Sequence, residues 1–367
     1  MRAPRLPPSA ARTGFSDLQP ELMAEIHGRL SFLDRLAFAA VSAPSRYAFK
    51  PELPWLVLPG ETPETAKRGR MRLANPVTGE QGELPAITTI PFVNATPPEG
   101  HHFMIDMEPF EKIRYRGELE GGLLHPHPYG MFTHTSGDMR LWFYRKVVLS
   151  ASPPRPGDYA AMLLLDNYFG APAFATAEDG RWRVMPSRDG VEDAIHHKGK
   201  FLSVTCTGIV EAWERDGGEF TSKVVTTRMS DGGDQRECRK YLAAAPDGRL
   251  MIVLKNTSGG VKKGYFEVKV FDEMTARWEE WEDIGKHAIL VGINSSLCVS
   301  TEKHPELKGG CVYYTNDEIG KASLRRGWYS QQSVGVYSLT DGTVESIPEL
   351  GMNRSWPPPA WFIPSFP

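Results

Sequence analysis

The sequence has few cysteines and no long apolar run. Its four cysteines are far apart and form no C-x-x-C pair, so we expect a reducing compartment, cytoplasm or nucleus, and not a disulfide framework. The longest apolar run, residues 160–165, is far shorter than the roughly 20 residues of a membrane helix. The first 14 residues lack the apolar core of a signal peptide. We therefore expect an intracellular protein with no membrane partner.

The sequence also lacks a strong charge and the common enzyme motifs. The net charge is -3, whereas a dedicated nucleic-acid binder is usually strongly basic, so no nucleic acid is expected as a partner. Phosphate-loop, dinucleotide, zinc-protease and serine-hydrolase motifs are absent. The histidine pairs at 101–102, 125/127 and 196–197 have no complementary ligand set nearby, so we expect no metal and no cofactor.

No catalytic residue is predicted. Cys311 lies in an apolar strand-like run and is interpreted as a buried core residue, not as a nucleophile. The acidic stretch 279–282 is interpreted as a solvent-facing edge between aromatic residues. The sequence therefore predicts a protein that is not an enzyme, and a propeller enzyme with a site in a central channel stays the less favoured alternative.

What the sequence does have is turn formers and short strand-like runs. It contains 35 glycines and 30 prolines, which favours many short strands joined by tight turns. One run, 265–271, alternates between apolar and polar residues over its whole length. The predicted strands are 201–206, 208–213, 250–254, 265–271, 311–314 and 334–339.

A weak internal repeat accompanies these strands. Tight hairpin tips are predicted at 78–80, 136–138, 179–181, 216–218, 275–277 and 341–343. Their uneven spacing fits four-stranded blades with loop insertions, so the sequence predicts a mainly β protein with a six-bladed, or seven-bladed, β-propeller over residues 51–367. Closure of the ring would leave only short strand edges. A pair of β-sandwiches is the alternative architecture.

Helical periodicity is convincing only near the N-terminus. Ser16 and Asp17 are good N-cap residues, and Pro20 suits a first helical turn. A first apolar stripe follows at Leu22, Ile26 and Leu30, and a second lies within 33–41 before a proline ends it. Residues 1–14 are interpreted as a tail and 15–50 as a short helical segment. Two such helices cannot bury a core alone, so their apolar faces need the rest of the chain or a partner.

Two parts of the chain resemble one plant family. The N-terminal segment resembles the F-box of grass proteins. The resemblance rests on residues 15–22, Ile26, Leu30 and residues 34–46. Three stretches near the C-terminus are similar to F-box proteins with a KIB-type β-propeller. They are Leu-Lys-Gly-Gly-Cys-Val-Tyr-Tyr-Thr-Asn-Asp at 307–317, Val-Tyr-Ser-Leu at 336–339 and Arg-Ser-Trp-Pro-Pro-Pro-Ala-Trp-Phe at 354–362. That family was long described as a domain of unknown function.

The resemblance implies a non-catalytic adaptor of a Skp–cullin–F-box ubiquitin ligase. The F-box would dock a Skp-type adaptor and through it a cullin–RING ligase, while the propeller would bind an unidentified target protein. Carried over by position, the docking surface would consist of Leu18, Pro20, Leu22, Ile26, Leu30 and Val41. An F-box usually has Cys-x-x-Trp-Arg after the valine, whereas this chain has Ser42-Ala43-Pro44-Ser45-Arg46. The alternative is a stand-alone propeller binding module with a degenerate F-box.

Several tryptophans are predicted to serve the propeller itself. Trp182, Trp213, Trp278 and Trp281 are expected to pack between blades, with an aromatic ligand platform as the alternative. The tail from Trp356 to Trp361 is expected to lie across the closing blade, with both tryptophans as anchors. A polyproline ligand for a partner is the alternative for this tail.

Overall fold

The structure is a computed structural model, and it describes only part of the chain. The described residues are 22, 56–59, 69–74, 81–96, 102–106, 131–150, 159–165, 170–187, 190–216, 219–226, 229, 238–256, 264–305, 307–315, 317, 334–346 and 361. Nearly all of them belong to one compact unit formed by residues 57–73 and 82–362. A second unit contains residues 1–56, 74–81 and 363–367.

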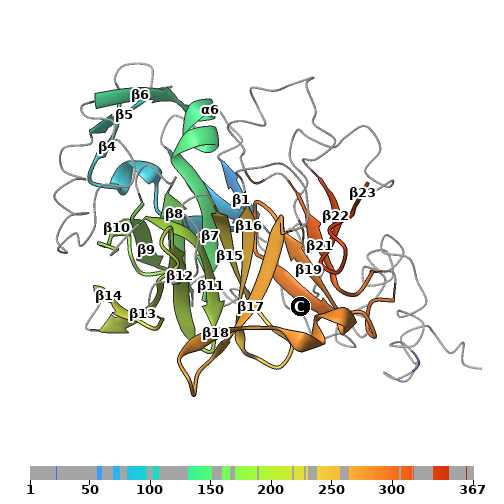
Figure 1. The fold of residues 1–367 in the computed structure, drawn as a ribbon. Coiled ribbons are helices and arrows are strands. Elements are labelled where there is room, and N and C mark those ends of the chain that lie inside the picture. The colour runs from blue at the N-terminus through green and yellow to red at the C-terminus, as the bar shows by residue number, and fades with distance from the viewer. Residues whose placement is uncertain are drawn as a thin grey trace, which may run out of the picture. The chain divides into compact units, whose positions relative to one another are not determined.

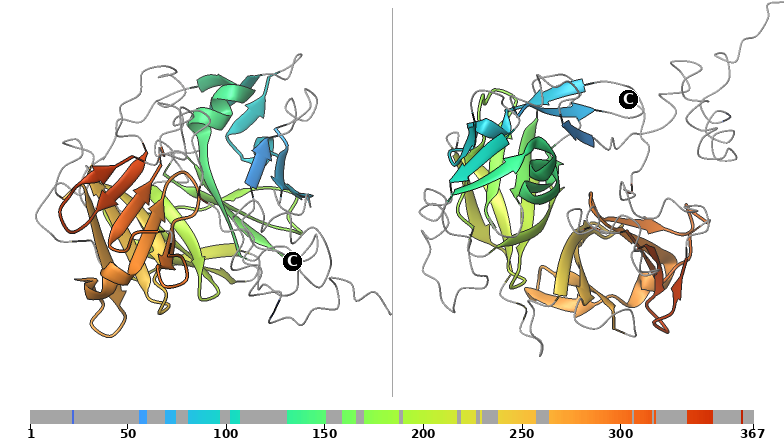
Figure 2. Two further views of the ribbon diagram at one scale, coloured as in Figure 1. Left: turned by 90° about the vertical axis from the view of Figure 1, so that its right-hand side faces the viewer. Right: turned by 90° about the horizontal axis from the view of Figure 1, so that it is seen from above.

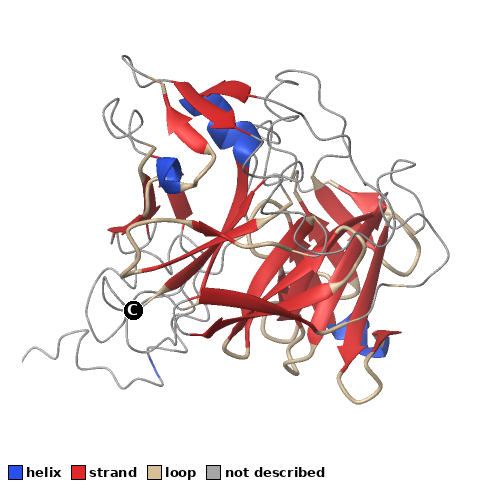
Figure 3. Ribbon diagram, turned by 90° about the vertical axis from the view of Figure 1, so that its left-hand side faces the viewer, coloured by secondary structure: helices blue, strands red, loops and turns tan. Residues whose placement is uncertain are grey.

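The described residues are mainly strand (Figure 3), which confirms the predicted fold class at that level. They form six separate sheets. The first sheet consists of β1 (Leu56–Pro59), β2 (Met71–Ala74) and β3 (Gln81–Leu84), and the second of β4 (Val93–Ala95), β5 (His102–Asp106) and β6 (Met131–Thr135). A short 3-10 helix, Ile87–Thr89, lies between these two sheets in the chain.

Three four-stranded antiparallel sheets follow (Figure 1). The third sheet consists of β7 (Tyr144–Leu149), β8 (Ala160–Leu165), β9 (Pro172–Thr176) and β10 (Arg183–Val184). The fourth sheet consists of β11 (Val191–His197), β12 (Lys200–Thr205), β13 (Val210–Asp216) and β14 (Glu219–Val224). The fifth sheet consists of β15 (Cys238–Ala244), β16 (Leu250–Asn256), β17 (Phe266–Asp272) and β18 (Arg277–Glu280).

The sixth sheet departs from this simple meander. Its order is β20-β19-β21-β22-β23, and β21 runs parallel to β19 whereas the other neighbours are antiparallel. A 3-10 helix, Glu282–Lys286, precedes β19. The strands are β19 (His287–Val291), β20 (Leu297–Ser300), β21 (Cys311–Tyr314), β22 (Gly335–Ser338) and β23 (Val344–Glu345).

In the fourth, fifth and sixth sheets the last strand is the least buried. The second strand β16 is buried over its first five residues, Leu250 to Leu254, whereas in the last strand β18 only Trp278 is not fully exposed. A strand covered on both faces has a continuous run of apolar residues, whereas an outer strand has polar residues in its sequence as well. All six strand-like runs predicted from the sequence coincide with strands: β12, β13, β16, β17, β21 and β22.

The third to sixth sheets follow one another in chain order, coloured from green to red in Figure 2. Strand β11 lies against β7 and β15, and β15 in turn lies near β20. Aromatic side chains fill the space between sheets: Phe174 of the third sheet stacks on Phe220 of the fourth, with ring centroids 4.3 Å apart. Trp213 lies 5.1 Å from the same Phe174 ring.

The tryptophans pack as predicted. Trp182 is 1% exposed and donates its indole N–H to the carbonyl of Pro85, and Trp213 and Trp281 are also buried within apolar clusters. Trp278 packs against Phe271, at 5.3 Å between ring centroids. In the tail, Trp361 donates its indole N–H to the carbonyl of Val291 at 2.9 Å and packs on the sixth sheet. This confirms Trp361 as an anchor, while Trp356 lies outside the described residues.

Four of the six predicted hairpin tips join the last two strands of a sheet. They are 179–181, 216–218, 275–277 and 341–343. The tip at 78–80 lies outside the described residues. The prediction for 136–138 was wrong: these residues form the helical turn α6 (Ser136–Asp138), which continues as a π-helix (Met139–Phe143) that leads from the second sheet to the third. The Asp138 carboxylate accepts hydrogen bonds from the backbone and hydroxyl of Thr135 and so stabilises this turn.

The helical segment at 15–50 is almost wholly outside the described residues. Leu22 alone is described, and it is helical. No described helix is long and apolar enough to cross a membrane. The number of blades stays a prediction.

Candidate functional site

Three pairs of adjacent charged residues occupy equivalent places in the third, fourth and fifth sheets. They are the second and third residues of the first strand of each sheet: Arg145-Lys146 on β7, Glu192-Asp193 on β11 and Arg239-Lys240 on β15. The three strands begin 47 residues apart each time. We call these pairs the charged doublets. Their sign alternates from sheet to sheet, so neighbouring strands present opposite charges to one another.

The Asp193 carboxylate joins three sheets. Its Oδ1 accepts a hydrogen bond from Lys146 Nζ at 2.6 Å, and its Oδ2 accepts one from the backbone N–H of Leu242 on β15 at 2.8 Å. Lys146 also donates to the carbonyl of Ala194 at 2.8 Å. The side chains of Lys146 and Asp193 are 6% and 5% exposed. A buried ion pair needs such additional hydrogen bonds to offset the desolvation of its charges.

A second pair links the fourth and fifth sheets. Glu192 Oε2 accepts a hydrogen bond from the backbone N–H of Lys240 at 3.0 Å and lies 3.5 Å from Lys240 Nζ. The Lys240 side chain is fully buried, and its ammonium also donates to the carbonyl of Cys238 at 2.8 Å. The chain thus satisfies both members of this pair within the domain.

The fifth sheet is joined to the sixth through Asp317, which follows β21. Its Oδ2 accepts hydrogen bonds from Arg239 Nε at 3.1 Å and from the Tyr241 hydroxyl at 2.9 Å. Its Oδ1 lies 3.4 Å from Lys255 Nζ on β16. Burial alone would raise the pKa of Asp317, but the Lys255 and Arg239 cations outweigh burial and hold the pKa well below its usual range. Asp317 is therefore ionised. Arg239, Tyr241, Lys255 and Asp317 are called the Asp317 cluster below.

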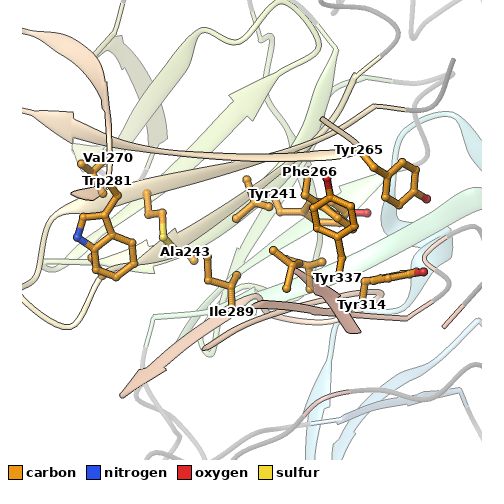
Figure 4. Close-up of a cluster of buried hydrophobic side chains, with 14 residues drawn as sticks. Tyr241, Ala243, Tyr265, Phe266, Val270, Trp281, Ile289, Tyr314 and Tyr337 are labelled. Atoms are coloured by element: carbon orange, nitrogen blue, oxygen red, sulfur yellow. The ribbon is translucent and has the colours of Figure 1, made fainter. Parts of the chain in front are cut away.

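Aromatic rings surround the two cations of this cluster. Lys255 Nζ lies 6.0 Å from the ring centroids of both Tyr265 and Tyr314, and the Arg239 guanidinium lies 5.5 Å from that of Tyr241. Figure 4 shows these tyrosines at one end of the apolar cluster shared by the fifth and sixth sheets, with Trp281 at the other end. Cations over aromatic faces are stabilised by the ring quadrupole.

The cysteines and one histidine of the described part of the chain have ordinary surroundings. No three His, Cys, Asp or Glu side chains there come together as a metal site. Cys311 is 7% exposed in an apolar cluster, as predicted, and burial raises the pKa of its thiol. Burial also raises the pKa of Cys298 to about 12. Both thiols are protonated at neutral pH and are therefore weak nucleophiles. His197, the last residue of β11, contacts the carbonyl of Gly248 at 3.0 Å.

The predicted docking residues are not brought together by the described structure. Leu18, Pro20, Ile26, Leu30 and Val41 lie outside the described residues. Leu22 is helical and its side chain is 48% exposed.

The charged doublets, in contrast, were not predicted from the sequence. Their signal was an interval of 47 residues between adjacent like-charged pairs of alternating sign, and the uneven hairpin tips obscured it.

These features indicate a class of protein: separate small sheets in chain order, joined by buried ion pairs and by aromatic contacts, fit the repeated blades of a β-propeller. The chain belongs to the KIB1-4 beta-propeller family, whose model matches residues 28–338. No curated protein matches the chain. The propeller interpretation is thereby supported over the pair of β-sandwiches.

Proposed function

We propose that this protein is the substrate-recognition adaptor of a Skp–cullin–F-box ubiquitin ligase in the cytoplasm or nucleus. The observation that carries the proposal is the combination of two parts in one chain. Residues 15–46 resemble an F-box, and residues 28–338 match the KIB1-4 beta-propeller. A β-propeller of this kind suggests a protein-binding module, and an F-box would connect that module to a ligase.

The charges of the domain support binding over catalysis. Four of the six side chains of the charged doublets are buried and paired with one another: Lys146 with Asp193, and Lys240 with Glu192. Groups held in this way stabilise the contact between sheets and do not converge on a reacting atom. The adaptor would act by holding its target protein in position. A target held near the charged ubiquitin carrier reacts at a raised effective concentration, with no chemistry contributed by the propeller.

The exposed, helical Leu22 supports the docking part of the proposal. Exposed apolar side chains on one helix face are the usual contact of a helix with a groove on its partner. The predicted first stripe adds Ile26 and Leu30 to that face.

Co-purification of the full chain with a Skp-type adaptor tests the proposal. We expect the wild type to retain the adaptor and a cullin, and the double variant L22E/I26E to lose both, because two carboxylates would be buried in an apolar interface. Met274 is 96% exposed on the turn after β17, so M274E is a matched control that adds a carboxylate outside the predicted helix and should retain both partners. Equal retention of wild type and L22E/I26E would refute docking through this face.

The second candidate function is a stand-alone propeller binding module, and the residue that favours it is Ser45. It stands where an F-box usually has a buried tryptophan. Because a tryptophan at the centre of an interface often contributes about 2 kcal/mol or more, S45W should strengthen adaptor binding by about 30-fold if the segment still docks. No adaptor binding by either wild type or S45W would support the stand-alone module.

A further inference from the structure

The charges of the Asp317 cluster do not balance. Two of the cations on the first strands are matched by carboxylates, because Lys146 is paired with Asp193 and Lys240 with Glu192. Two cations, Arg239 and Lys255, remain for the one carboxylate of Asp317. Arg145 on β7 adds to the positive field at that carboxylate.

The hydrogen-bond donors of the two cations exceed the acceptors as well. Arg239 donates Nε–H to Asp317, but its Nη1 is buried and has no acceptor. Within the described part of the chain, the only hydrogen-bond acceptor of the Lys255 ammonium is Asp317 Oδ1, at the long distance of 3.4 Å. An ammonium has three donors and a guanidinium five. The hydroxyl of Tyr314, whose ring faces Lys255, is also buried without a partner.

The side chains that carry these donors are mostly buried. The side chains of Arg239 and Lys255 are each 14% exposed, whereas that of Asp317 is 4% exposed. The hydroxyl ends of Tyr265 and Tyr314 lie at the end of the apolar cluster away from Trp281 (Figure 4). The Asp317 carboxylate therefore lies deeper than the two cationic side chains that hold it.

We propose that Arg239 and Lys255 bind a small oxyanion, the carboxylate or phosphate group of a ligand, beside Asp317. Buried donors without acceptors cost free energy, and a buried cation without a counter-charge costs more. A water molecule would accept hydrogen bonds but would leave the charge surplus, whereas an anionic oxygen removes both costs. Charge-assisted hydrogen bonds to an arginine and a lysine are the usual way in which proteins hold carboxylates and phosphates.

Titration calorimetry on the full-length protein tests the proposal, with sodium phosphate and sodium acetate as separate probes and sodium chloride at equal ionic strength as the reference. We expect saturable binding of one or both oxyanions above the chloride reference, and the probe that binds identifies the ligand group. K255M, which keeps the aliphatic stem between Tyr265 and Tyr314, should weaken binding at least ten-fold. D317N should strengthen it, because it removes the competing carboxylate charge without removing a cation.

K200M is the matched control, because Lys200 pairs with Glu214 at the surface and should leave oxyanion binding unchanged. A purely structural ion pair predicts the opposite behaviour for D317N, namely lower stability with no gain in anion affinity. The absence of saturable binding to the wild type would overturn the proposal, whether or not the variants fold. Binding that K255M retains at wild-type strength would also overturn it, since the anion would then be held elsewhere. Neither result depends on the ligase adaptor.

Discussion

Replacement of Asp193 by asparagine should destabilise the domain more than any surface charge change. The substitution is isosteric, and an asparagine oxygen can still accept the hydrogen bond from the backbone N–H of Leu242. What is lost is the counter-charge of Lys146 and the oxygen that accepts its hydrogen bond, since the ammonium lies 2.6 Å from the carboxylate and the lysine side chain is 6% exposed. D193N therefore isolates the charge from the shape of the side chain.

The expected magnitude follows from that burial. Removal of one partner of a buried ion pair leaves the other charge desolvated, at a cost of about 3 to 5 kcal/mol. With a urea m-value of about 3 kcal/mol/M, the midpoint of unfolding should fall by about 1 to 2 M. The exposed pair of Lys198 and Glu273, whose side chains are 56% and 67% exposed, supplies the control. E273Q should change stability by less than about 1 kcal/mol.

The double variant K146M/D193N provides the decisive comparison. Methionine keeps most of the apolar stem of Lys146, and neither charge remains, so the double variant should be more stable than D193N alone. Urea unfolding followed by circular dichroism measures the wild type, D193N, K146M, the double variant and the control E273Q. If D193N costs less than 1 kcal/mol, or if the losses of the two single variants simply add in the double variant, the pair does not hold the sheets together in the way argued above.

Two further predictions concern the tail and the pH dependence of stability. W361F keeps most of the contact with the sixth sheet but loses the hydrogen bond to Val291, so it should lower the melting temperature slightly. Deletion of residues 354–367 should lower the melting temperature markedly. An unchanged melting temperature after the deletion would favour the interpretation of the tail as a ligand for a partner. Burial lowers the pKa of His196 below its ordinary 6.5, so the unfolded chain binds the proton more readily and stability is lost as the pH falls below about 6.5. H196Q should reduce the difference between melting temperatures at pH 7.5 and pH 5.5, and an equal difference in wild type and H196Q would show that other groups control it.

Much of the fold could be predicted because several middle strands, such as β8, β12 and β16, are buried along nearly their whole length. The run from Leu250 to Leu254 is recognisable in the sequence for that reason, and it is β16 in the structure. The hairpin tips were recognisable where aspartate and glycine turns join exposed outer strands, as at 341–343. The same turn residues misled at 136–138, because the bonds between Thr135 and Asp138 stabilise a helical turn equally well.

The candidate site could not be predicted from the same signals. Lys146 and Asp193 are 47 residues apart in the chain, and nothing local to either residue indicates that the other will be its partner. Arg239 meets Asp317 across an even longer interval. A charged pair at the start of a strand usually indicates a solvated end, and only tertiary packing buries it. The equal intervals between the charged doublets were the one sequence signal, and that signal belongs to the repeat and not to any single strand.

The alternating sign of the charged doublets explains why charge is used between these sheets at all. Apolar first strands of similar shape would pack nearly as well in any order or register, because hydrophobic contact is not directional. A positive doublet on β7 and another on β15 can each face the negative doublet on β11, whereas direct contact between the two positive doublets would leave buried like charges unpaired. The doublets therefore penalise a wrong neighbour more than they reward the right one, as expected of a device for specificity. The excess cations at the Asp317 cluster lie where this series ends, and that position is why they remain available for an anion.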